Sequence, residues 1–332
     1  MTEIIAEIAQ AHDGSLGILH SYIDAVAKAG VDTVKFQMHI ADAESSAFEP
    51  FRVNFSYVDK TRFDYWKRME FTFDQWQEII NHCNEKKINF LCSPFSIEAV
   101  NNLEKLGATR YKIASGEILN KLMLSKIAAT KKPVLISSGM SNYEELDYAI
   151  NFLKDHTSQL SVFQCTTAYP TPAEQVGINV ISELKSRYNL PVGLSDHSGE
   201  IYPSLAAVSL GASLIEVHAV FDKEMFGPDA KSSLNMQQLG QLVEGVRFLD
   251  RALQNPVNKN DTEKYTSNKI IFGKSLAVNR DVQLGDYVLL EHLESKKPGD
   301  KGIPAAEFEK IVGKKYRSNL SKGVFINYSD IE

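Results

Sequence analysis

Apolar runs with little alternation recur along the chain and are separated by polar or helical segments. Each run is rich in Val, Ile, Leu or Phe, as expected for strands that are buried on both faces of a parallel sheet. The runs are residues 4–10, 33–39, 88–95, 110–116, 133–140, 160–166, 191–197 and 214–221. We therefore predict eight buried strands.

Amphipathic patterns with the helical period lie between these runs. They cover residues 16–29, 73–86, 97–106, 122–130, 143–153, 180–187, 202–210 and 236–253. Gly30, Gly107 and Gly211 stand where three of these helices should end. Eight strand–helix alternations over roughly 250 residues favour an α/β fold of the (β/α)₈ TIM-barrel type over a doubly wound sheet.

One connection, residues 40–70, is too long for an ordinary turn. Its aromatic residues are Phe48, Phe51, Phe55, Tyr57, Phe63, Tyr65 and Trp66. This content is unlike that of a disordered segment, and long loops in compact domains are usually functional or disordered. We therefore expect a packed active-site loop, although its aromatic residues could equally form a local core.

The barrel pattern ends at residue 253, which gives a catalytic domain over residues 1–253. Residues 254–268 are polar and contain Pro256, which indicates a linker. Residues 269–332 carry short apolar runs between Gly and Asp, which is typical of a small β-rich domain. The sequence therefore predicts two domains.

Composition narrows the possible environments and partners. The formal net charge is −6, which argues against nucleic acid as the main partner but leaves room for an anionic small substrate. Cys83, Cys92 and Cys165 form no CxxC pair, a sparse usage that suits a reducing cytoplasm. No signal peptide or membrane span is expected.

Polar and ionisable residues stand at the carboxyl end of nearly every predicted strand, where parallel barrels place their chemistry. They include Glu7, Lys35, Gln37, Ser93, Lys112, Ser115, Glu117, Ser137, Tyr169, Ser195, His197, Glu216 and His218. Two lysines with several hydroxyls could hold a phosphate and a carboxylate. Glu7 and Glu117 could move protons. Alternatively, Lys35 and Lys112 could simply form salt bridges with these glutamates.

His197 and His218 each end a predicted strand, and the two strands are consecutive. Two imidazoles at neighbouring strand ends could share one divalent metal with open positions for water and a carbonyl oxygen. Each could instead be a hydrogen-bonded core histidine. The sequence contains no GxGxxG, P-loop or HExxH motif, so nucleotide-binding and zincin interpretations have no support.

Nearly the whole chain resembles the bacterial sialic acid synthases. The matching motifs are AEIAQAHDG at 6–14, VKFQ at 34–37, SPF at 93–95, YKIASGE at 111–117, SSGM at 137–140, CTTAYPTP at 165–172, GLSDH at 193–197, EVH at 216–218 and GPD at 227–229. The second domain is similar to that family's antifreeze-like (SAF) domain, through KKPG at 296–299, VGK at 312–314 and SDIE at 329–332.

The resemblance implies a nonulosonic acid synthase. Such an enzyme condenses phosphoenolpyruvate with an N-acyl amino sugar such as N-acetylmannosamine and releases phosphate by C–O cleavage. It implies a divalent metal on His197 and His218, usually Mn²⁺, with Mg²⁺ or Co²⁺ possible. It also implies a domain-swapped homodimer in which the second domain caps the partner's barrel.

Residue roles follow from the same resemblance. The phosphoenolpyruvate pocket matches Lys35, Ser93, Lys112, Ser115, Ser137 and Ser195. Glu7 matches a carboxylate near the reacting centre. The sugar-binding positions match Gln37, Tyr169, Asp229 and Lys297.

Three departures from the family pattern bear on the acceptor sugar. Ala11 stands where an Asn is common, and Ala219, Val220 and Phe221 follow His218 where Phe-Thr is common. Lys297 replaces an arginine, so a point charge replaces a planar bidentate donor. A legionaminic, pseudaminic or other nonulosonic acid precursor is therefore as plausible an acceptor as N-acetylmannosamine.

Two other functions remain open from the sequence. Lys112 could be the nucleophile of a Schiff-base aldolase, which needs no metal. The antifreeze-like tail alone would suit a non-catalytic sugar- or ice-binding protein. The ring of ionisable strand-end residues argues against the second alternative.

Overall fold

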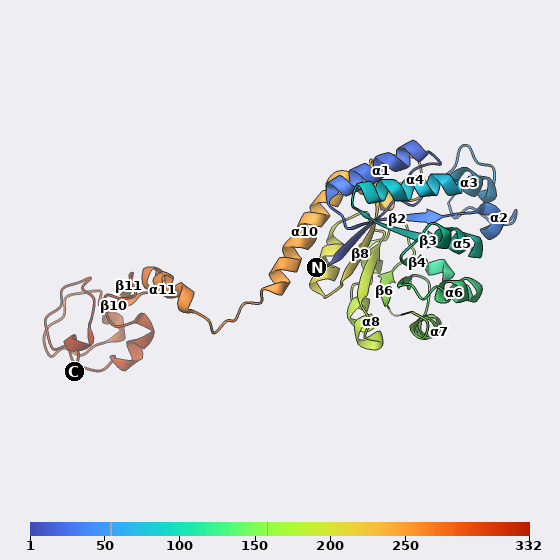
Figure 1. Ribbon diagram of the computed structural model, residues 1–332. Coiled ribbons are helices and arrows are strands. Elements are labelled where there is room, and N and C mark those ends of the chain that lie inside the picture. Colours follow the sequence, from blue (N-terminus) through green and yellow to red (C-terminus); the bar gives the residue numbers. More distant parts are fainter. Residues whose placement is uncertain (54, 158) are drawn as a thin grey trace. The chain divides into compact units, whose positions relative to one another are not determined.

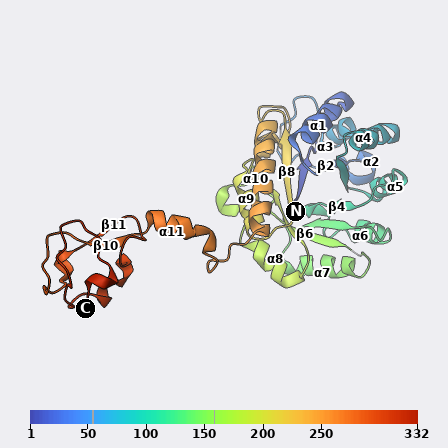
Figure 2. The same ribbon diagram turned by 60° about the vertical axis from the view of Figure 1, so that its left-hand side comes forward.

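A computed structural model describes residues 1–53, 55–157 and 159–332. It divides into two compact units, Met1–Asn255 and Pro256–Glu332. Figure 1 shows the first unit as strands surrounded by helices, and Figure 2 shows the same arrangement from a second direction.

Eight parallel strands form a closed barrel within the described residues. They are β1 (Glu3–Glu7), β2 (Thr33–Met38), β3 (Asn89–Pro94), β4 (Tyr111–Ile113), β5 (Val134–Ser137), β6 (Leu160–Cys165), β7 (Val192–Asp196) and β8 (Leu214–Val220). Each strand pairs with the next, and β1 pairs with β8, with Glu7 opposite His218. The predicted barrel is therefore confirmed; a short strand, β9 (Leu234–Asn235), follows β8 and was not predicted.

The main helices match the amphipathic patterns to within one or two residues at their ends. They are α1 (Leu16–Ala29), α4 (Phe73–Glu85), α5 (Ile97–Lys105), α6 (Lys121–Ala128), α7 (Tyr143–Lys154), α8 (Val180–Tyr188), α9 (Tyr202–Ser209) and α10 (Met236–Gln254). Side-chain caps fix several starts; Ser15, for example, accepts a hydrogen bond from the Ile18 amide. No helix in the described part of the chain is long and apolar enough to cross a membrane.

The β2–α4 connection, residues 39–72, folds onto itself and contains α2 (Ala41–Glu44) and α3 (Arg62–Met69). Ala41, Tyr65, Trp66 and Met69 form a small core with three partly buried phenylalanines around it. The prediction of a packed loop is thus confirmed for its described residues; residue 54 lies outside them. Its helices were missed because they are short and depend on this local core rather than on a long amphipathic stripe.

The second unit contains β10 (Ser275–Val278), which pairs antiparallel with β11 (Leu293–Lys296), together with isolated bridges. Its own core includes Leu276, Val278, Val288, Ile303 and Ile326. A helix, α11 (Thr266–Phe272), precedes β10 and begins inside the segment that we expected to be linker. Between α10 and the short turn of helix at Glu263–Tyr265, residues 255–262 have no helix or strand.

Candidate active site

The two-residue period of the strands carries polar side chains into the carboxyl end of the barrel. Ile5, Leu91, Leu135, Phe163 and Leu214 pack together as an apolar layer inside it. Two residues further along the same strands stand Glu7, Ser93, Ser137, Cys165 and Glu216. The same alternation that fills the barrel floor therefore places ionisable groups directly above it.

Gly193 on β7 makes this layer possible. A Cβ at this position would meet the Phe163 ring at 2.6 Å and the Leu214 carbonyl oxygen at 2.8 Å. Phe163 therefore lies close against β7 and supports Lys112, whose Nζ is 4.9 Å from the centre of the ring. A larger residue at 193 would displace the floor beneath a site lysine.

A cavity of about 170 Å³, here called the inner chamber, lies above this floor. It brings together eleven of the fourteen residues singled out from the sequence: Glu7, Lys35, Gln37, Ser93, Lys112, Ser115, Ser137, Tyr169, Ser195, His197 and His218. All except Gln37, Ser115 and Tyr169 are buried. The prediction that these strand-end groups meet at one mouth is confirmed.

Two lysines and two glutamates form a buried ion network at the base of the inner chamber. Lys35 Nζ lies 2.9 Å from Glu7 Oε2 and 2.8 Å from Glu216 Oε1. Lys112 Nζ and Ser195 Oγ also donate to Glu216 Oε1, at 2.8 and 2.9 Å. The salt-bridge alternative is thus partly right, because both lysines are paired, with Glu216 as the common partner rather than Glu117.

The two lysines differ in their ionisation. Burial disfavours the charged form of Lys35, but the adjacent Glu216 and Glu7 carboxylates outweigh it and raise the pKa of Lys35. Burial lowers the pKa of Lys112, and Glu216 offsets this only in part. Burial would raise the pKa values of Glu7 and Glu216, yet the neighbouring cations hold both below the ordinary range.

Three buried oxygen atoms of the inner chamber have no hydrogen-bond partner among the described residues. They are Ser93 Oγ, Ser137 Oγ and Glu216 Oε2. A buried polar atom without a partner is costly unless a ligand or water completes it. The two hydroxyls can donate to an anion that also contacts the lysines.

The imidazoles of His197 and His218 lie side by side, with 5.2 Å between ring centres. The Thr166 carbonyl lies 2.9 Å from His197 Nδ1, which fixes that nitrogen as the donor and leaves Nε2 facing Tyr169 OH at 3.1 Å. His218 Nε2 lies 3.2 Å from Glu7 Oε2. Such a carbonyl-oriented imidazole is the usual form of a metal-ligating histidine.

The donor set fits a divalent metal with an incomplete protein shell. No group of three His, Cys, Asp or Glu side chains in the described ranges is arranged to hold a metal. The protein would thus supply two imidazoles, and substrate and water the rest. Burial alone would lower the pKa of His197, but the Cys165 thiol raises it to about 9, so a metal there would displace a proton.

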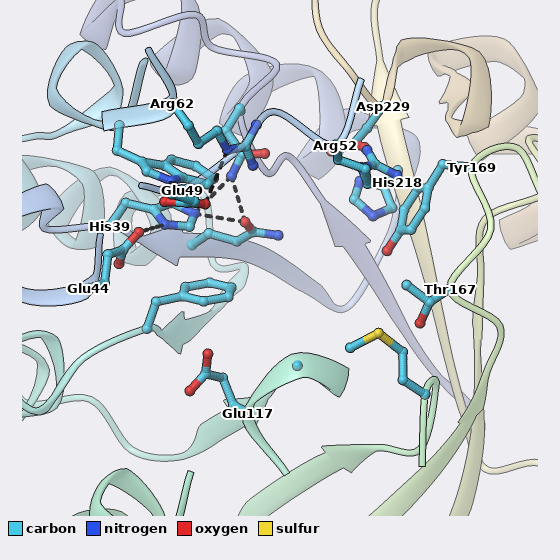
Figure 3. A pocket seen from close by; sticks show the side chains of 16 residues that line it. His39, Glu44, Glu49, Arg52, Arg62, Glu117, Thr167, Tyr169, His218 and Asp229 are labelled. Atoms are coloured by element: carbon cyan, nitrogen blue, oxygen red, sulfur yellow. Dashed lines mark hydrogen bonds and ion pairs between the residues drawn. The ribbon is translucent and has the colours of Figure 1, made fainter. Parts of the chain in front are cut away.

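A second cavity of about 490 Å³, the outer chamber, adjoins the inner one and shares seven lining residues with it, among them Gln37, Tyr169 and His218. Figure 3 shows its lining, to which the β2–α4 connection contributes six of the sixteen residues. Arg52 donates to Asp229 at 2.8 Å and lies 4.2 Å above the Tyr169 ring. The predicted residues Asp229 and Glu117 belong to this chamber.

Glu117 has a distinct setting in the outer chamber. Its Oε2 accepts a hydrogen bond from Asn120 Nδ2 at 2.7 Å, and burial raises its pKa. Lys297, the remaining predicted residue, lies directly after β11 in the second unit, where its Nζ is 5.2 Å from the Phe272 ring centre.

Several lining residues were not selected from the sequence as site residues. Glu216 was named among the strand-end residues but given no role, and it is the carboxylate that pairs both lysines. Arg52, Arg62, Glu49 and His39 come from the β2–α4 connection. Their only signal was the mixed basic and aromatic composition of that connection, which does not indicate which side chains point inward.

Comparisons with known proteins agree with this geometry. The model of the NeuB family matches residues 22–258, and that of the SAF domain matches residues 273–332. The chain is 34% identical to the N,N'-diacetyllegionaminic acid synthase of Campylobacter jejuni, over 98% of each chain. It is 32% identical to the human N-acetylneuraminate-9-phosphate synthase, over 94% of this chain and 88% of the relative.

A solved structure extends the agreement to three dimensions. The crystal structure of the N-acetylneuraminic acid synthetase of Leptospira borgpetersenii superposes with a TM-score of 0.71 at 28% identity, covering 80% of this chain and 91% of that one. The family resemblance seen in the sequence motifs is therefore confirmed. The chain belongs to the NeuB family and carries a carboxyl-terminal SAF domain.

Proposed function

We propose that this protein is a nonulosonic acid synthase that joins phosphoenolpyruvate to the aldehyde of an open-chain N-acyl amino sugar. The observation that carries the proposal is the inner chamber, where two buried lysines and two unpartnered serine hydroxyls converge beside paired imidazoles. The family relatives support it, since they include legionaminic, pseudaminic and neuraminic acid synthases. Within the transferases, the reaction falls in the class that transfers a carbon skeleton from phosphoenolpyruvate.

Phosphoenolpyruvate would occupy the inner chamber. Its phosphate and carboxylate would accept hydrogen bonds from the two lysines and the surrounding hydroxyls, which are those of Ser93, Ser115, Ser137 and Ser195. The ion network is poised for this exchange, because Glu216 already holds both ammonium groups at the chamber base. Charge-assisted contacts of this kind are roughly twice as strong as neutral ones.

The acceptor sugar would extend from the imidazole pair into the outer chamber. Gln37, Tyr169 and Asp229 line the passage and offer an amide, a phenol and a carboxylate to its hydroxyl and acyl groups. The outer chamber is the larger of the two, as an extended amino sugar requires.

The chemistry forms one C–C bond and breaks one C–O bond. C3 of phosphoenolpyruvate attacks the aldehyde carbon, whose oxygen becomes an alkoxide. Water then adds to the cationic C2, and Glu7 accepts one of its protons and returns one to the alkoxide, which regenerates the carboxylate. The resulting tetrahedral carbon expels phosphate, which takes the hydroxyl proton and leaves a 2-keto acid. Lys35, Lys112 and the serines hold the charge that develops on the leaving phosphate.

A divalent metal is the proposed cofactor, with His197 and His218 as its protein ligands. When bound, a Mn²⁺ ion, or Mg²⁺ or Co²⁺ in its place, would act as a Lewis acid toward the aldehyde oxygen. Glu7 stands next to His218 and fixes the orientation of that imidazole.

The test is phosphate release from phosphoenolpyruvate with a panel of N-acyl hexosamines and 2,4-diacetamido hexoses, with Mn²⁺ present. We expect release to require both an acceptor and the metal. If no acceptor supports release while the folded protein still binds phosphoenolpyruvate, the proposed reaction is wrong.

A Schiff-base aldolase is the second candidate, and the lowered pKa of Lys112 favours it. Lys112 Nζ nevertheless donates to the Glu216 carboxylate, which favours the ammonium form, and an ammonium nitrogen has no lone pair for attack. Borohydride trapping of substrate on Lys112, with activity that survives a chelator, would establish this alternative in place of the first.

We also propose that the second unit caps the barrel of a partner subunit, with Lys297 contacting the sugar there. The support is the matched SAF domain and the family resemblance. The test mixes His218→Ala and Lys297→Ala subunits, since a swapped heterodimer has one site with both residues intact. Verified heterodimers that remain inactive, although each homodimer folds, would show that the SAF domain acts in cis or that Lys297 has another role.

A further inference from the structure

A chain of hydrogen bonds runs from the β2–α4 connection to Glu7, and His39 is its central member. His39 is 5% exposed and lies just beyond β2. Its Nδ1 lies 2.6 Å from Glu44 Oε1 on α2 (Figure 3). Its Nε2 lies 2.9 Å from Gln37 Oε1. Gln37 Nε2 in turn donates to Glu7 Oε1 at 2.6 Å.

Aromatic stacking on both faces holds the ring of His39, in addition to the contacts of its nitrogens. Trp66 of α3 stacks on one side, with ring centres 3.8 Å apart and planes inclined by 17°. Phe95, which follows β3, stacks at 4.4 Å and 19°. One imidazole therefore touches both short helices of the connection and the end of a barrel strand.

The polarity of the chain is set at Gln37. The Glu44 carboxylate can only accept, so His39 Nδ1 donates to it and His39 Nε2 is left as an acceptor. Gln10 Nε2 supplies the donors on that side, since it lies 3.0 Å from His39 Nε2 and donates to Gln37 Oε1 at 2.5 Å. Gln10, held by His39, thus keeps the Gln37 amide oxygen outward, while Gln37 Nε2 donates to Glu7 on the other side. If the amide turned over, its oxygen would face a carboxylate.

We propose that His39 is a positioning residue, through which the β2–α4 connection fixes the orientation of Gln37 and thereby of Glu7. His39 touches no reacting atom in this scheme. Among the described residues, the ion-pair partners of Glu7 are Lys35 and His218, both at Oε2, so the Gln37 amide holds its other oxygen, Oε1. The inference rests on the proposed function only for the step that Glu7 serves; the hydrogen-bond chain itself can be examined without turnover.

The decisive variant is His39→Phe, because phenylalanine can keep both ring stacks but neither hydrogen bond. We expect kcat to fall about 10- to 100-fold, the effect of losing a buried orienting hydrogen bond. The dissociation constant of phosphoenolpyruvate, measured by calorimetry, should stay within about twofold of wild type, since the lysines and serine hydroxyls proposed to bind it are unchanged. His156→Phe, the same substitution at an exposed histidine just after α7 that lines neither chamber, is the matched control and should retain nearly full kcat.

A crystal structure of the His39→Phe variant tests the same inference without an activity assay. We expect the Gln37 amide to leave Glu7. A Gln37 side chain that remains within hydrogen-bond distance of Glu7 would overturn the proposal, and so would a kcat equal to that of wild type.

The less disruptive Glu44→Gln variant serves if His39→Phe does not fold, with a smaller expected fall in kcat and the same structural readout. Absence of turnover in the wild-type protein would count against the proposed reaction alone, because the crystallographic result would still decide the role of His39.

Discussion

The inner and outer chambers differ in how they are built. Strand ends supply nearly all of the inner chamber, and its groups are buried and held by one another. The outer chamber takes much of its lining from the β2–α4 connection, and its ion pairs are more exposed, as with Arg52 and Asp229 at 41% and 16%. Under the proposed function, rigid strands would position the reacting groups, and the loop would surround the part of the sugar that varies among substrates.

Removing an imidazole from the inner chamber should have the largest effect. We expect His197→Ala or His218→Ala to lower kcat by about 10³-fold or more, since Lewis-acid polarisation is worth several kcal/mol. Phosphate release measures the loss, and circular dichroism checks that the fold persists. Near-wild-type turnover of either variant in metal-depleted buffer would contradict the metal assignment.

Removing a lysine from the inner chamber should have the next largest effect, and that effect should fall on phosphoenolpyruvate. Lys35→Ala or Lys112→Ala deletes a charge-assisted contact worth about 1.5–3 kcal/mol, so the KM for phosphoenolpyruvate should rise more than tenfold. The KM for the sugar should change little. A rise confined to the sugar would mean that the assignment of the two chambers is reversed.

A substitution in the outer chamber should affect the KM for the acceptor sugar rather than that for phosphoenolpyruvate, and the effect should be smaller. Arg52→Ala removes a partly exposed partner of Asp229, a loss of about 0.5–1 kcal/mol that should raise the KM for the acceptor two- to fivefold. Arg251→Ala, an exposed arginine on α10, is the control. If phosphoenolpyruvate binding weakens instead, the chambers do not act as separate sites.

The smallest expected effect concerns stability. Burial raises the pKa of Glu117, so the native state binds its proton more tightly than the unfolded state does. Ionisation of Glu117 therefore lowers the free energy of unfolding, and this loss develops as the pH rises from the ordinary carboxyl pKa through the raised one. Glu117→Gln should slightly raise Tm at about pH 8 and leave it unchanged at about pH 4. A lower Tm at both pH values would show that the carboxylate stabilises the fold.

The barrel could be predicted from the sequence. Eight strands without apolar–polar alternation, each followed by an amphipathic helix, leave few other arrangements. The sequence also specified the inner chamber, since strand ends converge in any such barrel, as Glu7, Lys35 and His218 illustrate. It could not indicate that Arg52 or His39 would face a cavity. Their orientation depends on the packing of Trp66 and Tyr65 in a local core, a property with no periodic signal.

The fate of one oxygen atom tests the central proposal most directly. Phosphoenolpyruvate carrying ¹⁸O in the bridge between C2 and phosphorus would be turned over with Mn²⁺ and an accepted N-acyl amino sugar, and both products analysed by mass spectrometry. C–O cleavage predicts that the label leaves with inorganic phosphate and that the keto oxygen of the new acid comes from water. A labelled keto oxygen, or labelled pyruvate without a sugar adduct, would contradict the account.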